Sequence, residues 1–171
     1  GDDGSVEITL EDGQRKIRRA KLPVEAFRRG LRWEDLPVQA WWPNLEGPQP
    51  LYSLTCRLLD ALGVEQQRAV RRVGFKHVEW LPCAGAPPQA DPWLCQVNGR
   101  PVFLQGVNFA PLRANFADVR RQDYEQKLNI YRQLGANLLR INACQFLERQ
   151  EFYDLCDELG LMVWQEFPLT S

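Results

Sequence analysis

Two leucine–glycine pairs, Leu134-Gly135 and Leu159-Gly160, lie 25 residues apart in this chain, and an apolar segment follows each of them. Before each pair, apolar residues recur every three or four positions, which predicts helices over about 121–134 and 149–159. The apolar segments at 137–141 and 161–164 are then expected to be strands. Alternation of strands and helices through short turns predicts βα units with parallel strands, which need cover on both faces.

The same pattern begins further upstream with a turn. The pair Asn98-Gly99 predicts a hairpin with arms at about 93–97 and 102–109. The second arm is apolar enough to be a buried strand, and we interpret it as the first strand of the parallel set.

The first half of the chain has a different pattern, typical of β structure. Apolar and polar residues alternate at 6–10 and 51–58, a turn at 11–13 lets 14–18 return as a strand, and segment 67–80 is rich in Val, Phe and Trp. Four or five strand candidates are therefore expected in this half. Short strands of this kind favour an immunoglobulin-like β-sandwich, although too few are visible for a complete one. The segment 83–92 is rich in Pro, Gly and Ala and is interpreted as a linker. The sequence thus predicts an α+β multidomain chain with a partial sandwich at 1–82 and βα units at 93–171.

Composition excludes several classes of function. A formal net charge of −1 and a pI of about 5.9 argue against a nucleic-acid partner, which would require a basic face. No apolar stretch is long enough to span a membrane, and the first twenty residues contain no secretory signal. The five cysteines show no metal-like spacing, and four of them lie in apolar stretches, which favours a reducing compartment and hence the cytoplasm. Glycine-rich phosphate motifs are also missing, so no metal and no cofactor is expected.

Polar side chains are predicted to gather where the parallel strands end, because ligands bind at that edge in barrels and in open α/β sheets. Asn108 follows the first strand, Arg140 with Asn142 the second, and Gln165 with Glu166 the third. An amide, a guanidinium and a carboxylate would suit a polyhydroxylated ligand. In the alternative interpretation, these groups only cap the strand ends and pair with each other, Arg140 with Glu166 in particular.

Other conspicuous residues receive structural interpretations. His77 is the single histidine and is expected to be an ordinary surface or core residue, so a triad that requires histidine has no support. The acidic residues of the second helix are expected to form its solvated face; they are Glu148, Glu151, Asp154, Asp157 and Glu158. Trp41 and Trp42 could stack on a sugar, but packing against a neighbouring domain is the favoured role.

Several of these segments together resemble glycoside hydrolase family 2. The resemblance covers about residues 38–167, in the order of the family. Its first half resembles the immunoglobulin-like domain of the family, and its second half resembles the beginning of the family's (β/α)8 barrel. The segments that carry it are Trp41-Trp42-Pro43-Asn44, Gly47, Gln49-Pro50-Leu51-Tyr52, Val73-Gly74-Phe75-Lys76, 98–108, 134–140 and 152–167. Within the family, Trp-Pro-Asn and the Trp164-Gln165-Glu166-Phe167 segment look closest to β-mannosidases.

The resemblance implies a retaining glycosidase that uses two glutamates about 5 Å apart. In the family these glutamates follow the fourth and seventh barrel strands, so both are expected beyond Ser171 and none of the residues here is assigned a catalytic role. What transfers is part of the substrate-binding rim: Asn108, Arg140, Trp164 and Glu166. The segment Asn142-Ala143-Cys144 departs from the family, where an aromatic residue and glycines are usual, so the sugar itself is left open.

Two kinds of function therefore stand side by side. In the first, the chain is a piece of a β-mannosidase-like glycosidase with a carbohydrate substrate, and it is inactive by itself. In the second, it is a non-catalytic module that binds carbohydrate or protein, or one subunit of a split glycosidase. An open barrel edge after the third strand would favour association with further chains.

Overall fold

A computed structural model describes residues 4–143 and 145–168, so Cys144 and Ser171 of the sequence predictions lie outside the described residues. The chain divides into two compact units, residues 1–39 with 50–75, and residues 40–49 with 76–171. These limits differ from the predicted domains 1–82 and 93–171. Segment 40–49 and the residues from 76 onward belong to the second unit, because they pair and pack within it.

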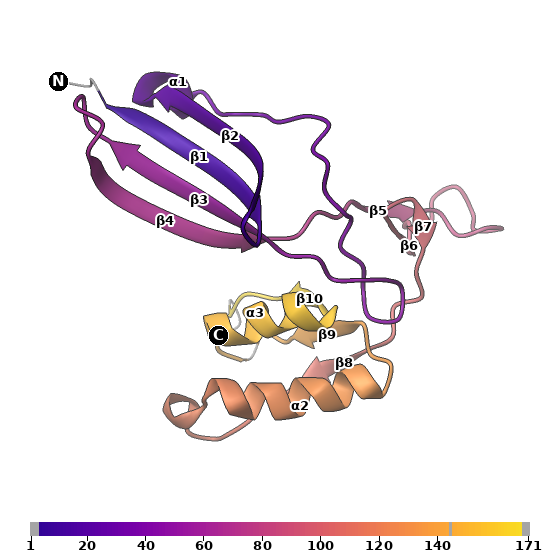
Figure 1. Ribbon diagram of the computed structural model, residues 1–171. Coiled ribbons are helices and arrows are strands. Elements are labelled where there is room, and N and C mark those ends of the chain that lie inside the picture. Colours follow the sequence, from indigo (N-terminus) through magenta and orange to yellow (C-terminus); the bar gives the residue numbers. More distant parts are fainter. Residues whose placement is uncertain (1–3, 144, 169–171) are drawn as a thin grey trace. The chain divides into compact units, whose positions relative to one another are not determined.

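In the first unit the strands form an antiparallel sheet in the order β2-β1-β3-β4 (Figure 1). Gly13, with φ 58°, closes the turn between the first two strands, and the short helix α1 (Val24–Arg28) follows β2. The strands are β1 (Ser5–Asp12), β2 (Arg15–Pro23), β3 (Tyr52–Leu59) and β4 (Glu65–Val73). The described residues of this unit form this single sheet, and the second sheet that a sandwich requires stays a prediction.

An ion-pair network crosses this sheet through a buried carboxylate. Glu7 of β1 accepts hydrogen bonds from Arg19 of β2 and, at 3.0 Å, from Arg57 of β3. Arg57 also donates to Glu65 of β4 at 2.5 Å. The Arg19 contact, assisted by Arg57, holds the pKa of Glu7 below its ordinary value although burial opposes the shift. The network therefore ties together all the strands of this sheet.

The predicted β segment 67–80 contributes to two strands that belong to different sheets. β4 ends at Val73, and β5 (Val78–Leu81) pairs instead with β6 (Leu94–Val97) in a small antiparallel sheet that also holds β7 (Arg100–Pro101). The predicted linker 83–92 is consequently the loop between two paired strands. The Asn98-Gly99 turn is confirmed, since both residues have positive φ, 50° and 79°.

The second arm of that hairpin is shorter than predicted. β7 ends at Pro101, and β8 (Gly106–Phe109) belongs to another sheet, in which it pairs in parallel with β9 (Leu138–Ile141). Asn137, which is buried, redirects the chain between them: its amide donates to the carbonyl of Phe103 and its Oδ1 accepts from the backbone of Gln105, both at 2.9 Å.

β10 (Met162–Gln165) completes the parallel sheet in the order β10-β9-β8, as the βα repeat predicts. The helices α2 (Arg121–Gln133) and α3 (Gln150–Leu159) contribute Tyr124, Leu128 and Phe152 to its main core, where they pack with Phe109, Leu139 and Ile141 of the strands. The short helix η1 (Phe116–Asp118) precedes α2. Among the described residues, no helix is both long and apolar enough to cross a membrane.

Segment 40–49 links the ends of both helices. Asn44 is buried, and its amide nitrogen donates to the carbonyls of Arg132 and Ala136, both at 2.9 Å. Its backbone N–H donates to the carbonyl of Gly160 at 2.8 Å. Trp41 is buried as well, and its Nε1 donates to the carbonyl of Asp157. Packing is therefore the role of Trp41, and its ring is not available to a sugar.

Candidate functional site

Asn108, Arg140 and Trp164 lie side by side in one row across the parallel sheet. Asn108 of β8 and Trp164 of β10 are both direct register partners of Arg140 of β9. Side chains in one row project to the same face, and the neighbouring residues Leu139 and Val163 pack on the opposite face with the helices. The row therefore lies on the face that α2 and α3 leave uncovered.

The guanidinium of Arg140 connects this row to the residue after β10. Its Nε donates to Oε1 of Glu166 at 2.8 Å, and its Nη1 donates to Oδ1 of Asn108 at 3.1 Å. The other carboxylate oxygen of Glu166 accepts from the backbone N–H of Ala143 at 3.1 Å. The guanidinium carbon also lies 5.6 Å from the ring centre of Trp164. All four predicted rim residues, Asn108, Arg140, Trp164 and Glu166, thus meet at one place.

The surroundings of Glu166 favour its charged form. The hydrogen bond from Arg140, followed by the one from the Ala143 backbone, lowers the pKa of Glu166 below its ordinary value. A carboxylate that is held ionised and paired is suited to fixing the guanidinium in position. It is poorly suited to donating a proton. The alternative interpretation expected Arg140 to pair with Glu166, and this pair is present. The Trp164 ring beside the pair is half exposed.

Gln165 turns away from this group. Its Oε1 accepts a hydrogen bond from the hydroxyl of Tyr153 at 2.6 Å, on the face covered by α3. His77 is exposed and pairs with Glu79 at 2.9 Å, as expected for an ordinary surface residue. In the parts of the chain that the structure describes, no cluster of three or more His, Cys, Asp or Glu side chains could hold a metal ion.

Glu148 contradicts the prediction of a solvated acidic face. It is 8% exposed and accepts a hydrogen bond from the Tyr124 hydroxyl at 2.5 Å. Burial raises the pKa of Glu148 above its ordinary value, with the Tyr124 hydrogen bond acting in the opposite direction. Glu148 lies two residues before α3 begins, so it is not on the solvated face of that helix, and its burial results from the distant partner Tyr124.

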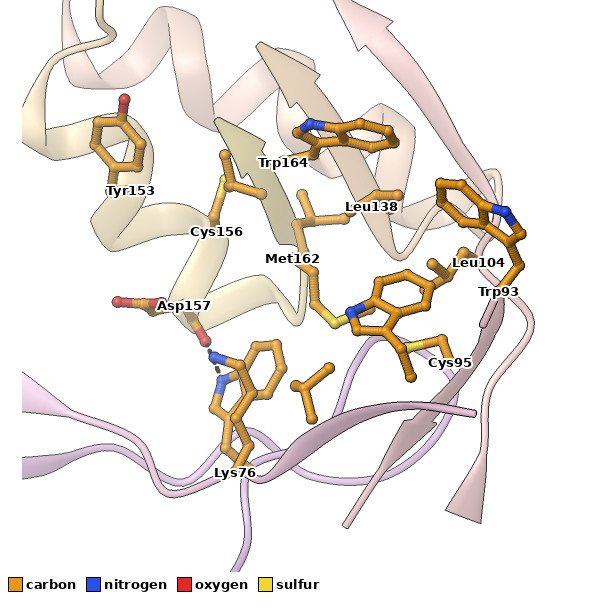
Figure 2. Close-up of a pocket in the computed structure, with 15 residues that line it drawn as sticks. Lys76, Trp93, Cys95, Leu104, Leu138, Tyr153, Cys156, Asp157, Met162 and Trp164 are labelled. Carbon is orange, nitrogen blue, oxygen red and sulfur yellow. Dashed lines mark hydrogen bonds between the residues drawn. The ribbon is translucent and has the colours of Figure 1, made fainter. Parts of the chain in front are cut away.

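An apolar pocket of about 560 Å³ adjoins the row along the edge of β10 that no other described strand pairs with. Leu138 and Met162 lie two residues before Arg140 and Trp164, on the same face of the sheet, and they point into the pocket (Figure 2). Trp93, Leu104 and Cys95 approach them from the other wall. Gly106 completes that earlier row, and a Cβ at this position would lie 2.4 Å from the Leu138 carbonyl oxygen, so the close strand contact requires glycine.

Comparison with known proteins agrees with this arrangement. Residues 92–171 match the family model "Glycosyl hydrolases family 2, TIM barrel domain". The β-mannosidase of Rattus norvegicus is 32% identical over 166 residues, which are 96% of this chain and 18% of that protein. The chain belongs to glycoside hydrolase family 2. The chain spans less than a fifth of the length of the Rattus norvegicus β-mannosidase.

Other family 2 comparisons extend the match to solved structures. The β-D-mannosidase of Dictyoglomus thermophilum superposes with a TM-score of 0.74 at 26% identity, over 95% of this chain and 20% of that protein. A β-glucuronidase of Bifidobacterium dentium superposes with a TM-score of 0.77 at 20% identity, over 98% of this chain and 25% of that one, which shows a shared fold. The predicted family and its likeness to β-mannosidases are thereby confirmed.

Proposed function

We propose that these residues supply one side of the sugar-binding site of a retaining, β-mannosidase-like glycoside hydrolase. The observation that carries the proposal is the Arg140 guanidinium, oriented by Glu166 and Asn108 in the same row as Trp164. Guanidinium and amide groups donate hydrogen bonds to sugar hydroxyls, and an indole ring offers a flat apolar surface to a pyranose. We also propose that the first unit is part of an immunoglobulin-like sandwich.

In this proposal Glu166 is a positioning residue, and the glutamates of the retaining mechanism are not among these residues. A general acid of a glycosidase needs a raised pKa, and the pKa of Glu166 is lowered by Arg140. Glu148 has a raised pKa, but its carboxylate is buried against Tyr124. We therefore expect no hydrolysis of p-nitrophenyl β-D-mannopyranoside by the 171-residue chain above the rate in buffer. Turnover that disappears in Glu166→Gln would contradict this assignment.

Binding tests the proposal more directly than turnover does. Methyl β-D-mannopyranoside should give saturation-transfer NMR signals with the 171-residue chain, and Arg140→Ala should abolish them. Arg132→Ala is a matched control, because Arg132 is exposed on α2, and α2 packs against the opposite face of the parallel sheet. Circular dichroism verifies that each variant is folded. Equal signals from Arg140→Ala and the wild type would exclude Arg140 from the site.

The free edge of β10 favours a second candidate, a binding subunit that associates with the remainder of a barrel. The partner would add a parallel strand with apolar side chains beside β10. The pocket there is lined by apolar residues on both faces of the sheet, Met162 on one face and Val163 on the other. Light scattering distinguishes this candidate. Association at micromolar concentration that Val163→Lys prevents would support it, and a strictly monomeric chain would exclude it.

A further inference from the structure

We infer that Tyr153 and Gln165 are positioning residues that hold Glu166, and through it the Arg140 guanidinium, in the orientation that a sugar would meet. This inference rests on the proposed function and adds residues on the opposite face of the sheet. Gln165 lies on the same face as Val163, which packs with the helices, whereas Arg140 lies on the other face. The two faces are therefore linked through consecutive residues at the end of β10.

The backbone of Glu166 is fixed at both of its polar groups. Its N–H donates to the carbonyl of Ile141 at 3.0 Å, which extends the hydrogen bonds of the parallel sheet one residue past β10. Its carbonyl accepts from Nε2 of Gln165 at 2.6 Å, so the side chain of the preceding residue bonds back to the main chain. A main chain held in this way keeps the Glu166 carboxylate beside Arg140, whose Nε and Nη2 lie 2.8 and 2.5 Å from Oε1.

The direction of each of these hydrogen bonds follows from the chemistry of the groups. A backbone carbonyl only accepts, so Gln165 must present its amide nitrogen to Glu166. The amide oxygen then faces Tyr153, whose hydroxyl must donate to it, at 2.6 Å. Burial raises the pKa of the Tyr153 hydroxyl above its ordinary value, so this donor stays protonated at neutral pH. One hydroxyl on α3 thus selects the orientation of the Gln165 amide.

Tyr153 is itself held in place by the core of the parallel sheet. It extends from α3 (Figure 2), and its ring packs against that core, with ring centres 5.2 Å from Phe152 at an interplanar angle of 85°. Side chains that are fixed by packing and by hydrogen bonds hold a binding group in a productive geometry. Tyr153, Gln165 and Glu166, which we call the relay, give Arg140 such support from the helix-covered face.

The test removes one contact of the relay at a time. Tyr153→Phe deletes the hydroxyl, and Gln165→Met deletes both amide bonds while it keeps the length of the side chain. In each variant Arg140 should hold the Glu166 carboxylate less firmly, so the pKa of Glu166, measured by carbon NMR, should rise toward its ordinary value of 4.5. A merely structural loss of stability does not move this pKa in the folded protein. Methyl β-D-mannopyranoside should bind roughly fivefold more weakly, as expected for the loss of one neutral hydrogen bond.

A double-mutant cycle distinguishes a relay from two independent contacts. Tyr153 acts through Gln165, so adding Tyr153→Phe to Gln165→Met should change neither the pKa of Glu166 nor the affinity any further. Tyr131→Phe is the matched control, since it removes a tyrosine hydroxyl from α2 and leaves the ring that contacts Phe109. Circular dichroism verifies that every variant is folded.

The outcomes separate this inference from the proposed function. An unchanged pKa of Glu166 in folded Tyr153→Phe overturns the relay, as do effects that add in the double variant, and the proposed function stands if Arg140→Ala still abolishes binding. A raised pKa without any mannoside binding to the wild type supports the relay and overturns the proposed function. A raised pKa together with weaker mannoside binding supports both.

Discussion

The hydroxyl of Tyr124 donates to the carboxylate of Glu148 at 2.5 Å, and this contact joins the first half of α2 to the residue two positions before α3. Both side chains are buried, so neither can exchange its partner for bulk water.

Tyr124→Phe should lower the free energy of unfolding by about 1–3 kcal/mol, because it leaves a buried carboxylate without its hydrogen bond. Tyr131→Phe on the same helix is the control, since Tyr131 contacts Phe109 through its ring and should tolerate the change within about 0.5 kcal/mol. Urea denaturation measures both. Similar losses in the two variants would mean that the hydroxyl of Tyr124 contributes nothing specific.

The stability contributed by Glu148 should depend on pH with a definite sign. Its folded pKa is raised above the ordinary value of 4.5, so its contribution is fully present below the unfolded pKa and is lost as pH rises through the folded pKa. The wild type should therefore lose stability relative to Glu148→Gln as pH rises from about 3.5 to about 7. Urea denaturation across this range measures both proteins, and a wild type that gains stability relative to Glu148→Gln as pH rises would refute the assignment.

Glu166 should show the opposite dependence. Its pKa is lowered by Arg140, so its contribution is present above the unfolded pKa and disappears as pH falls through the folded pKa. At neutral pH Glu166→Gln should be less stable than the wild type, and the two should converge as the pH falls below the folded pKa of Glu166. The same titration with Glu151→Gln, an acidic residue in the first turn of α3, provides the comparison. A gap between wild type and Glu166→Gln that persists unchanged in acid would exclude the ion pair as its cause.

Two glycines that end the helices differ in what surrounds them. Gly135 and Gly160 have φ of 86° and 77°, so alanine is strained at both by about 1–2 kcal/mol. A Cβ on Gly160 would also lie 2.6 Å from the backbone nitrogen of Asn44, whereas at Gly135 its nearest neighbours are at 3.5 Å. Gly160→Ala should therefore be clearly more destabilising than Gly135→Ala in thermal or urea unfolding. Equal losses would show that segment 40–49 can move aside.

Asn44→Asp should be more destabilising than Asn44→Ala. The side chain faces the carbonyls of Arg132 and Ala136, so a carboxylate would place negative charge against two acceptors. Alanine only removes the donors, at an expected loss of about 1–3 kcal/mol. Asn129→Ala, which removes a single bond to the Glu125 carbonyl within α2, should change the stability far less. An order in which aspartate is tolerated best would contradict the orientation of the Asn44 amide.

The elements that local pattern determines could be predicted from the sequence. The period of 25 residues, the glycines after the helices and the Asn98-Gly99 turn are each properties of neighbouring residues, and all of them are found in the structure. The convergence of Asn108, Arg140 and Glu166 was predictable because parallel strands end at one edge.

Sheet membership could not be predicted in the same way. Val, Phe and Trp recur from β4 through β5, but the two strands hydrogen-bond to different partners, and nothing local to residues 67–80 specifies which. The apolar segment 102–109 likewise changes sheets where Asn137, distant in sequence, binds Phe103 and Gln105. Glu148 was misassigned because it lies two residues before α3 rather than in it, and its partner Tyr124 lies 24 residues earlier in the sequence.

Segment 40–49 has a consequence for how this chain can be divided. The backbone passes between the two units at residues 39–40, 49–50 and 75–76, so each unit is assembled from separate stretches of sequence. A polypeptide cut at residue 92, where the family model begins, would lose Asn44 and Trp41 and leave the carbonyls of Arg132, Ala136 and Asp157 without these donors. Shuffling or excising the parallel sheet as a module therefore requires a gene that carries residues 40–49 along with it.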